Sequence, residues 1–456
     1  MQKDNQFSKV LKIDAERNAP CATRIPYARQ WIDEEDIRAV VEVLRSDWLT
    51  TGPIVGEFEA AFARFVGARE AVAVNSGTAA LHAAMYAIGI GPGDEVILPP
   101  MTFAATANAV VFQGGTPIFA DINPHTLLID PAEVEAKITS RTKAITAVDY
   151  AGQPCDYDAL QAIATRHGLI LIADACHALG AEYRGRKAGT LANLTVFSFH
   201  PVKHITTGEG GMITTDDPAL AESMRLFRNH GITRKTLSAK RQAPSVGPWY
   251  YEMLDLGYNY RLTDIQCALG LSQLKKQPKF LRRRCEIAAK YDEALADIPE
   301  IEPLGLRSHV LRASQSAKRM AQSEARPSPS SSDPLLSACP VEFTEGDSAA
   351  YSTGALYSLH SYHLYVVRID FSSLGIDRVR LFEAMREKGI GLNVHYIPVH
   401  LHPFYRETFA AGTGLCPVAE RAYEQIVSLP LFPSMADEDV EKVITSVIES
   451  VNVKHG

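Results

Sequence analysis

The sequence lacks the features that would mark a membrane-spanning, secreted or zinc-binding protein. No stretch of about 18 consecutive apolar residues occurs, so no membrane-spanning helix is predicted. Residues 1–20 are polar and charged and lack the apolar core of a secretory signal. The 7 cysteines are scattered, and none of them forms a C-x-x-C pair. We therefore expect neither a disulfide framework nor a metal site, and the predicted location is cytoplasmic.

The chain also lacks a strong charge of either sign. Its 46 Lys and Arg oppose 53 Asp and Glu, which gives a formal net charge of −7 spread along 456 residues. This balance argues against nucleic acid or an anionic membrane as the main partner, and no helix-turn-helix with a basic face is visible. The length favours two globular domains, and 46% hydrophobic and 22% charged residues are typical of a soluble protein.

Short apolar runs alternate with helical patterns over residues 25–270. Because the runs are nearly continuous, each is interpreted as a strand buried on both faces. The runs cover residues 71–74, 96–98, 117–120, 144–148, 169–173, 196–199 and 212–214. Helical stretches between them predict an α/β fold with a mainly parallel, helix-covered sheet of seven strands. Ligands of such sheets bind beyond the carboxyl ends of the strands.

A second, smaller region is expected toward the C-terminus. The elements predicted there are helices 263–276 and 281–296, strand 362–371, helix 379–388, strand 391–396 and helix 437–451. We therefore predict a tail over 1–22, a large domain over 23–270 and a small α/β domain over 271–456. Within the last, the low-complexity composition of residues 306–357 predicts a disordered insertion.

A lysine and a carboxylate stand at the ends of two predicted strands. Asp174 follows the run 169–173, and Lys203 lies among apolar neighbours just before the glycine-rich run 208–211. A lone lysine is usually solvated, but these neighbours favour a partly buried amine with a lowered pKa, which is a usable nucleophile. A carboxylate nearby could hold a pyridine nitrogen protonated. The pair thus predicts a pyridoxal 5′-phosphate (PLP) enzyme.

Two segments supply candidates for binding the cofactor phosphate. Asn75-Ser76-Gly77-Thr78 leads from a strand into a helix, where Gly77 allows close approach and Thr78 adds a hydroxyl beside the helix amides. A simple Ser or Thr helix cap is the alternative interpretation of this segment. Ser198, five residues before Lys203, is the second phosphate candidate.

Two further side chains are candidates for the cofactor ring. Phe103 follows the second strand, so its ring could stack on a pyridine, although packing in the core explains an isolated Phe equally well. His177 follows Asp174 by three residues and could contact the ring or the substrate.

Taken together, these motifs resemble the DegT/DnrJ/EryC1/StrS family of PLP-dependent sugar aminotransferases. The similarity covers nearly the whole chain apart from the tail and the insertion. The matching stretches are residues 48–53, 75–78, 174–177, 198–203, 208–211 and 257–264. Within the family, residues 199–210 and 393–400 are most similar to the branch that acts in the pseudaminic acid pathway.

The resemblance implies a fold type I homodimer with shared active sites. Lys203 would bind PLP as a Schiff base, Asp174 would pair with the pyridine nitrogen, and Phe103 would stack on the ring. The other implied contacts are the phosphate with Gly77, Thr78 and Ser198; the neighbouring subunit's cofactor with Asn259; and the substrate with Tyr27, Asp47, Trp48, Leu49, Thr50, His395 and Tyr396.

The implied reaction is amination at C4 of a UDP-linked 4-keto-6-deoxy-N-acetylhexosamine, UDP-2-acetamido-2,6-dideoxy-beta-L-arabino-hex-4-ulose, with L-glutamate as donor. Family dehydratases carry histidine in place of Lys203, so the lysine favours transamination. The alternatives are another nucleotide keto sugar, as a different C4 epimer or a C3 ketone, and a non-catalytic sugar-binding or regulatory relative. Arg228 and Arg261 are both candidates for binding the glutamate carboxylate, while His200 and His204 have no assigned role.

Overall fold

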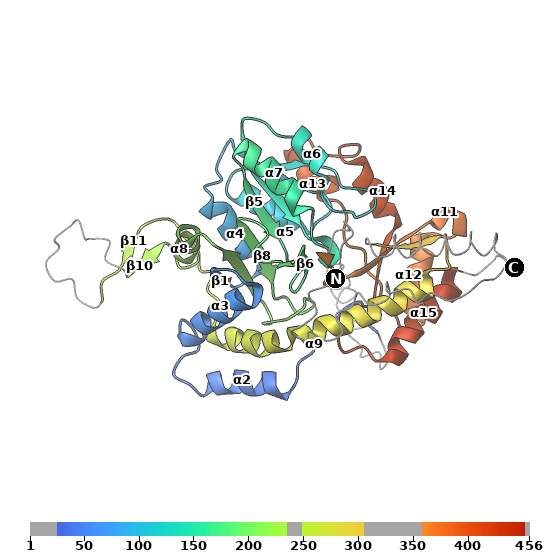
Figure 1. Ribbon diagram of the computed structural model, residues 1–456, viewed down its shortest axis with the longest axis horizontal. Helices are drawn as coiled ribbons and strands as arrows, with labels where there is room; N and C mark the ends of the chain where they lie inside the picture. The colour runs from blue at the N-terminus through green and yellow to red at the C-terminus, as the bar shows by residue number, and fades with distance from the viewer. Residues whose placement is uncertain (1–24, 235–248, 305–357, 452–456) are drawn as a thin grey trace, which may run out of the picture.

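The computed structural model describes residues 25–234, 249–304 and 358–451 of the chain. The predicted tail and insertion lie outside these residues. The described part has a large lobe around one sheet and a smaller lobe, and the long helix α9 (Asp264–Leu295) runs along both (Figure 1). Over the described residues, no helix is both long and apolar enough to cross a membrane.

The large lobe contains the predicted sheet. Its 7 strands lie in the order β1-β9-β8-β5-β4-β2-β3. They are β1 (Glu70–Val74), β2 (Glu95–Leu98), β3 (Thr116–Phe119), β4 (Thr142–Val148), β5 (Ile170–Asp174), β8 (Leu194–Ser198) and β9 (Gly211–Thr215). Neighbouring strands from β3 to β8 are parallel, whereas β9 runs antiparallel to both β1 and β8. Each predicted run forms one of these strands, so the mainly parallel α/β sheet is confirmed.

Helices cover the sheet because its strands expose apolar side chains on both faces. The helices of this lobe are α2 (Glu34–Leu44), α3 (Pro53–Val66), α4 (Gly77–Ala87), α5 (Ala104–Phe112), α6 (Pro131–Ala136), α7 (Tyr157–His167) and α8 (Pro218–Phe227). In α4, residues 79–85 are all buried, as expected for a helix enclosed by a core. Burial of α4 fixes its first residue, Gly77, at the edge of the sheet.

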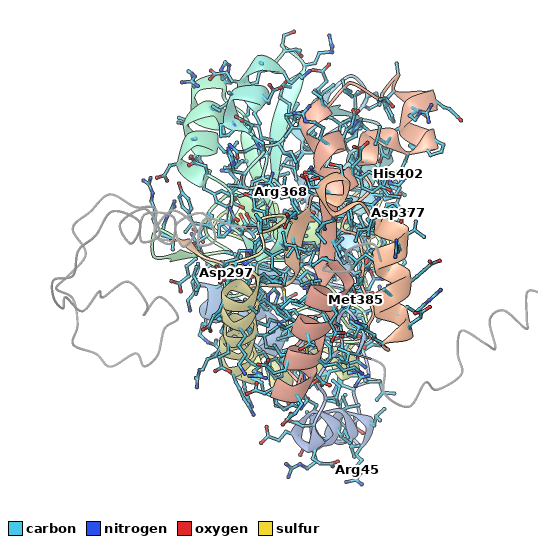
Figure 2. The ribbon with its side chains drawn as sticks, turned by 90° about the vertical axis from the view of Figure 1, so that its right-hand side faces the viewer. Arg45, Asp297, Arg368, Asp377, Met385 and His402 are labelled. Carbon is cyan, nitrogen blue, oxygen red and sulfur yellow. The ribbon has the colours of Figure 1, made fainter. Side chains whose placement is uncertain are left out.

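The small lobe is built on an antiparallel sheet in the order β12-β14-β15. Its elements are β12 (Ile301–Pro303), β14 (Tyr365–Ile369), β15 (Ile426–Leu429), α11 (Phe371–Leu374), α12 (Arg378–Glu387) and α15 (Asp437–Val451). Figure 2 has this lobe toward the viewer, with Asp377 at the start of α12 on the right and Arg45, beyond the end of α2, at the bottom. The short helices α13 (Pro403–Thr408) and α14 (Pro417–Gln425) contribute Tyr405, Ala419 and Ala422 to the core of the large lobe instead.

Helix α9 is continuous where the sequence predicted two helices, and that prediction was wrong. Pro278 lies inside it, although proline removes a backbone donor and disfavours a helix interior. A capping box between Thr263 and Gln266 stabilises its start. Burial stabilises its length, since Leu274 packs in the large core and Tyr291 in the small one. The predicted domain boundary after residue 270 falls within this helix.

The predicted strand over 391–396 is also wrong. Isolated bridges join Ile25 to Ile390 and Asn393 to Ser428, and no regular strand forms between them. The Asn393 side chain accepts a hydrogen bond from the Val394 amide, and the Tyr150 hydroxyl donates to the His395 carbonyl. Such side-chain bonds replace the ladder that a strand would need.

Replacing Pro278 by Ala tests the cost of the proline in α9. Pro278 is exposed, so the change removes little packing and restores a helical donor. We expect P278A to raise the free energy of unfolding by up to about 3 kcal/mol. Thermal and urea unfolding followed by circular dichroism measure this, with Lys275→Ala on the same exposed surface as the control. Lower stability of P278A would mean that the two lobes require the proline at this point.

Candidate active site

Three chain segments meet at the edge of the large sheet where β5 and β8 end. Asp174 is the last residue of β5, Ser198 is the last residue of β8, and Gly77 begins α4 directly after β1. A side chain on Gly77 would place its Cβ 2.9 Å from the Ser198 Cβ, closer than packing allows. Glycine therefore lets Ser198 and the start of α4 come together, which brings two of the predicted phosphate candidates to one place.

The carboxylate of Asp174 is buried and fixed by two donors. Thr106, on α5, donates its hydroxyl to Oδ2 at 2.7 Å, and the Cys176 amide donates to Oδ1 at 3.2 Å. Thr102 lies 2.7 Å from the Thr106 hydroxyl and completes the chain of hydrogen bonds. These partners hold the carboxylate in one orientation at the end of β5.

Lys203 lies in the turn between β8 and β9, near Asp174 and Cys176. Burial lowers the pKa of its ammonium, and the negative charge of Asp174 acts in the opposite direction. A lowered pKa increases the fraction of neutral amine, which is the nucleophilic form. Lys203 is thus half-buried, as predicted, and lies at the same edge as the oriented carboxylate.

Aromatic side chains from both lobes surround this edge. The His177 Nε2 lies 2.9 Å from the Tyr396 hydroxyl. His395 packs against Tyr27 at 5.4 Å between ring centroids and places its Nδ1 2.9 Å from the Ser428 hydroxyl. The predicted substrate residues Tyr27, His395 and Tyr396 thus form one group, and that group contacts His177.

Phe103 caps the start of α5, the helix that also carries Thr106. Its side chain is 62% exposed, so one face of the ring is open to a ligand. The ring lies 6.0 Å from that of Tyr396 between centroids and is tilted to it by 53°. Phe103 is therefore a surface aromatic at the site and does not pack in the core.

The remaining predicted residues lie away from Lys203 within one chain. Residues 47–50 are exposed at the start of α9, where the Asp264 amide donates to the Leu49 carbonyl at 3.1 Å. Asn259 is also exposed, and its carbonyl accepts a hydrogen bond from the Asn75 side chain at 3.3 Å. Among the described residues, no hydrogen bond or ion pair links residues 47–50 or Asn259 to Lys203.

The two candidate arginines differ in their partners. Arg228 forms an ion pair with Glu59 and donates to the Ala73 carbonyl, so its charge is already compensated. Arg261 donates to the Asn229 side chain at 2.8 Å, and within the described ranges no carboxylate forms an ion pair with it. Both arginines line the same hollow of about 410 Å³, so they differ in their partners and not in their access to it. The structure favours Arg261 as a binding residue for an anion.

Sequence reasoning missed His363. Its Nε2 lies 3.5 Å from the Lys203 Nζ, and its ring packs on that of His177 at 4.3 Å between centroids. The alternating pattern of the predicted strand 362–371 placed His363 on the same side as Tyr365 and Val367, which are core residues. No local signal separated it from them.

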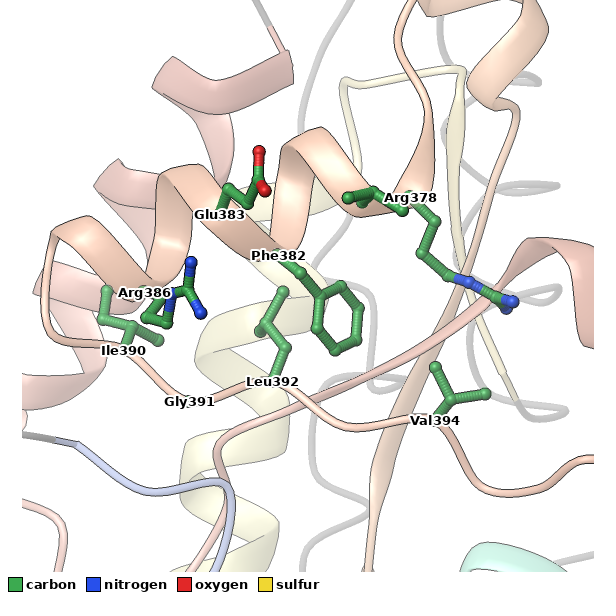
Figure 3. Close-up of a pocket in the computed structure, with 9 residues that line it drawn as sticks. Arg378, Phe382, Glu383, Arg386, Ile390, Gly391, Leu392 and Val394 are labelled. Carbon is green, nitrogen blue, oxygen red and sulfur yellow. The ribbon is translucent and has the colours of Figure 1, made fainter. Parts of the chain in front are cut away.

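A separate hollow of about 380 Å³ lies on the small lobe, between α12 and residues 390–394 (Figure 3). Phe382 and Leu392 form its apolar floor, and the Arg378 and Arg386 side chains lie at its two ends. None of the predicted catalytic or binding residues lines this hollow.

The residues at the sheet edge fit PLP. Lys203 offers an amine of lowered pKa, and Asp174 offers a carboxylate aimed by two donors. Gly77 opens the start of α4, where the helix dipole favours a phosphate, and Ser198 packs against it. The donor set therefore matches the aldehyde, pyridine nitrogen and phosphate of this cofactor.

Comparison with known proteins agrees with this chemistry. The profile of the DegT/DnrJ/EryC1/StrS aminotransferase family matches residues 30–328 and 335–448. The spore coat polysaccharide biosynthesis protein SpsC of Bacillus subtilis is 41% identical over 428 residues, which are 94% of this chain and 97% of SpsC.

Solved structures of sugar aminotransferases share the fold. Helicobacter pylori PseC, an aminotransferase involved in the biosynthesis of pseudoaminic acid, is 31% identical with a TM-score of 0.76, covering 94% of this chain and 99% of PseC. The putative sugar aminotransferase Spr1654 from Streptococcus pneumoniae, in its PLP form, is 30% identical with a TM-score of 0.77, covering 94% and 99%. The chain therefore belongs to the DegT/DnrJ/EryC1/StrS aminotransferase family and is a PLP-dependent sugar aminotransferase of fold type I.

Proposed function

We propose that this enzyme transfers the amino group of L-glutamate to C4 of UDP-2-acetamido-2,6-dideoxy-beta-L-arabino-hex-4-ulose, a step of pseudaminic acid biosynthesis. The buried Lys203 amine beside the oriented Asp174 carboxylate carries the transaminase part of this proposal. The similarity of residues 199–210 and 393–400 to the pseudaminic acid branch, and the match to PseC along 94% of the chain, support the choice of sugar.

The roles of the catalytic residues follow from their positions. PLP, when bound, supplies an electron sink for the charge that develops on the donor carbon. Lys203 holds the cofactor through Nζ, and the freed Nζ takes the proton from that carbon and delivers it onward as a general base and acid. Asp174 keeps the pyridine nitrogen protonated because Thr106 and the Cys176 amide aim its carboxylate. Nζ of Lys203 serves as the acid and base first in the reaction with glutamate and then in the reaction with the keto sugar.

The binding residues complete this proposal around Lys203. Gly77, Thr78 and Ser198 hold the phosphate at the start of α4. The exposed Phe103 would stack on the cofactor ring, and His177, which contacts Tyr396, would also bind the cofactor. The sugar lies against the group formed by Tyr27, His395 and Tyr396.

A homodimer with shared sites is part of the same proposal. Asn259 and residues 47–50 are exposed, and Trp48 is 55% exposed. Large apolar side chains on a surface are typical of an interface. We assign these residues to the active site of the neighbouring subunit, and we place the dimer in the cytoplasm.

A different nucleotide keto sugar is the second candidate. SpsC shares 41% identity with this chain, compared with 31% for PseC, and its name assigns it to spore coat polysaccharide biosynthesis. This similarity favours an enzyme of the same chemistry that accepts another C4 epimer or a C3 ketone. The non-catalytic alternative is set aside because Lys203 and Asp174 are both in place.

A substrate panel distinguishes these sugars. The purified enzyme is incubated with glutamate and UDP-linked 4-keto sugars of both C5 configurations, a TDP-linked 4-keto sugar and a nucleotide-linked 3-keto sugar. We expect the beta-L-arabino-hex-4-ulose to have the highest kcat/KM, and NMR of the product to place an amine at C4. Preference for the 3-keto or the TDP-linked sugar would establish the second candidate.

Replacing Lys203 by Ala tests the catalytic amine. K203A loses both the cofactor attachment and the base, so we expect formation of 2-oxoglutarate from glutamate and the keto sugar to fall by at least about 10³-fold. The visible absorbance of lysine-bound PLP, which glutamate removes in the unchanged enzyme, is absent in K203A. Lys275→Ala, an exposed change, serves as the control. Undiminished turnover by K203A contradicts the assignment.

Replacing Arg261 by Gln tests the glutamate site. Loss of a charged hydrogen bond to the carboxylate is expected to raise KM for glutamate roughly 10- to 100-fold and to leave KM for the sugar unchanged. Arg225→Gln is the control, because Arg225 lines the same hollow but pairs with Glu70. Steady-state kinetics with each substrate varied measure this. An equal rise in both KM values would show that Arg261 acts on the fold rather than on glutamate.

A further inference from the structure

His363 lies directly beside the reactive lysine although it is distant in sequence. The two residues are 160 positions apart, and the Lys203 Nζ is 3.5 Å from the His363 Nε2. The His363 side chain is buried, and its residue is 3% exposed. It lies in the segment that leads into β14.

The backbone on either side of His363 is held by buried groups. Arg284, on α9, is fully buried and donates to the carbonyls of Tyr362 at 3.1 Å and His363 at 3.2 Å. The Leu364 amide donates to the Ala151 carbonyl at 3.2 Å, and the Ser361 amide donates to the Gly152 carbonyl at 2.9 Å. These bonds tie the segment to both α9 and the large lobe, so the imidazole has a fixed position against Lys203.

The surroundings of His363 keep its ring neutral. Burial, followed by the positive charge of Lys203, holds the pKa of His363 well below its ordinary value. His177 and His204 pack against the ring at 4.3 and 5.6 Å between centroids, and burial lowers the pKa of both. A neutral imidazole has one nitrogen that donates and one that accepts.

The geometry assigns the acceptor to Nε2. The Lys203 Nζ carries hydrogens that it can donate in both its protonated and its neutral form, and the protonated form can only donate, so we take the facing Nε2 as the acceptor. The Nδ1 of His363 then carries the proton, and it has no hydrogen-bond partner among the residues that the structure describes. An unpaired buried polar atom is costly, which indicates that the contact with Lys203 is what this histidine is placed to make.

We propose that His363 is a positioning residue that accepts a hydrogen bond from Nζ of Lys203 whenever the amine is not bonded to the cofactor. The proposal rests on the role of Lys203 in the proposed function. A lysine has a flexible four-carbon stem, so a released amine would otherwise sample many positions. An acceptor on a fixed segment keeps Nζ within reach both of the carbon from which it takes the proton and of the different atom to which it delivers that proton.

The test uses full-length protein from which PLP has been removed, so it is independent of the sugar. Competitive acylation with acetic anhydride, followed by mass spectrometry of the Lys203 peptide, gives the pH midpoint of Lys203 labelling. The variants are His363→Phe, His363→Asn, whose shorter amide falls short of Nζ, and His363→Gln, whose amide oxygen reaches it. His360→Phe is the control, since it lies in the same segment and packs on Tyr362.

The sign of the change decides the outcome. An acceptor favours the charged amine, so we expect the midpoint to move to lower pH in H363F and H363N and to stay near the unchanged value in H363Q and H360F. The other groups that face Lys203 are Asp174, Cys176, His177, His204 and His395, and they are the same in all variants. A midpoint in H363N that rises or stays constant overturns the proposal, because His363 is then charged or makes no bond.

The PLP-loaded enzyme gives a second measurement. In single turnovers with glutamate alone, we expect H363N to slow loss of the lysine-bound PLP absorbance roughly 10-fold without changing the glutamate concentration at half-maximal rate. H363Q should recover most of the rate. If H363N changed only the glutamate concentration at half-maximal rate and not the maximal rate, His363 would be a substrate contact and the proposal would be overturned. Failure of the enzyme on the keto sugar, with these results intact, would contradict the proposed function alone.

Discussion

The active site of this enzyme depends on the placement of one amine, Nζ of Lys203, in a half-buried position between the two lobes. Burial lowers the pKa of Lys203 and makes it reactive, but the same burial requires polar partners on each side. The sheet edge supplies the negative charge of Asp174, and the segment before β14 supplies the His363 Nε2. Neither lobe provides both partners, so the site depends on how the lobes are joined.

Helix α9 and its buried residue Arg284 connect the two lobes. The helix contributes Leu274 to one core and Tyr291 to the other, which fixes the lobes along a common axis (Figure 1). Arg284 is fully buried and donates through Nη1 to the carbonyls of Tyr362, His363 and Leu431. A buried charge is tolerated only with such partners, and here the partners are the backbone of the catalytic segment. Packing far from Lys203 thereby positions the side chain next to it.

Much of the large lobe was predictable from local pattern, and the errors have physical causes. Continuous apolar runs predicted each strand of the main sheet, because a strand that is buried on both faces needs apolar side chains at nearly every position. The polar residues after those runs, Asp174 and Ser198, share one edge because β5 and β8 are parallel. The break expected in α9 was wrong because tertiary burial outweighed the propensity of Pro278. The predicted strand over 391–396 was wrong because backbone groups in this segment form hydrogen bonds with side chains instead of with a neighbouring strand.

The sequence by itself determined the family and the cofactor chemistry and made Lys203 the candidate for the reactive amine, because short motifs at strand ends carry these properties. Tertiary structure alone decided which side chains complete the site. It separated Arg261 from Arg228, since only the fold shows that Glu59 already compensates Arg228. It also brought His363 to Lys203 across 160 residues. The alternating pattern of a strand indicates which of its side chains are buried. Which residues contact those side chains depends on the packing of the whole molecule.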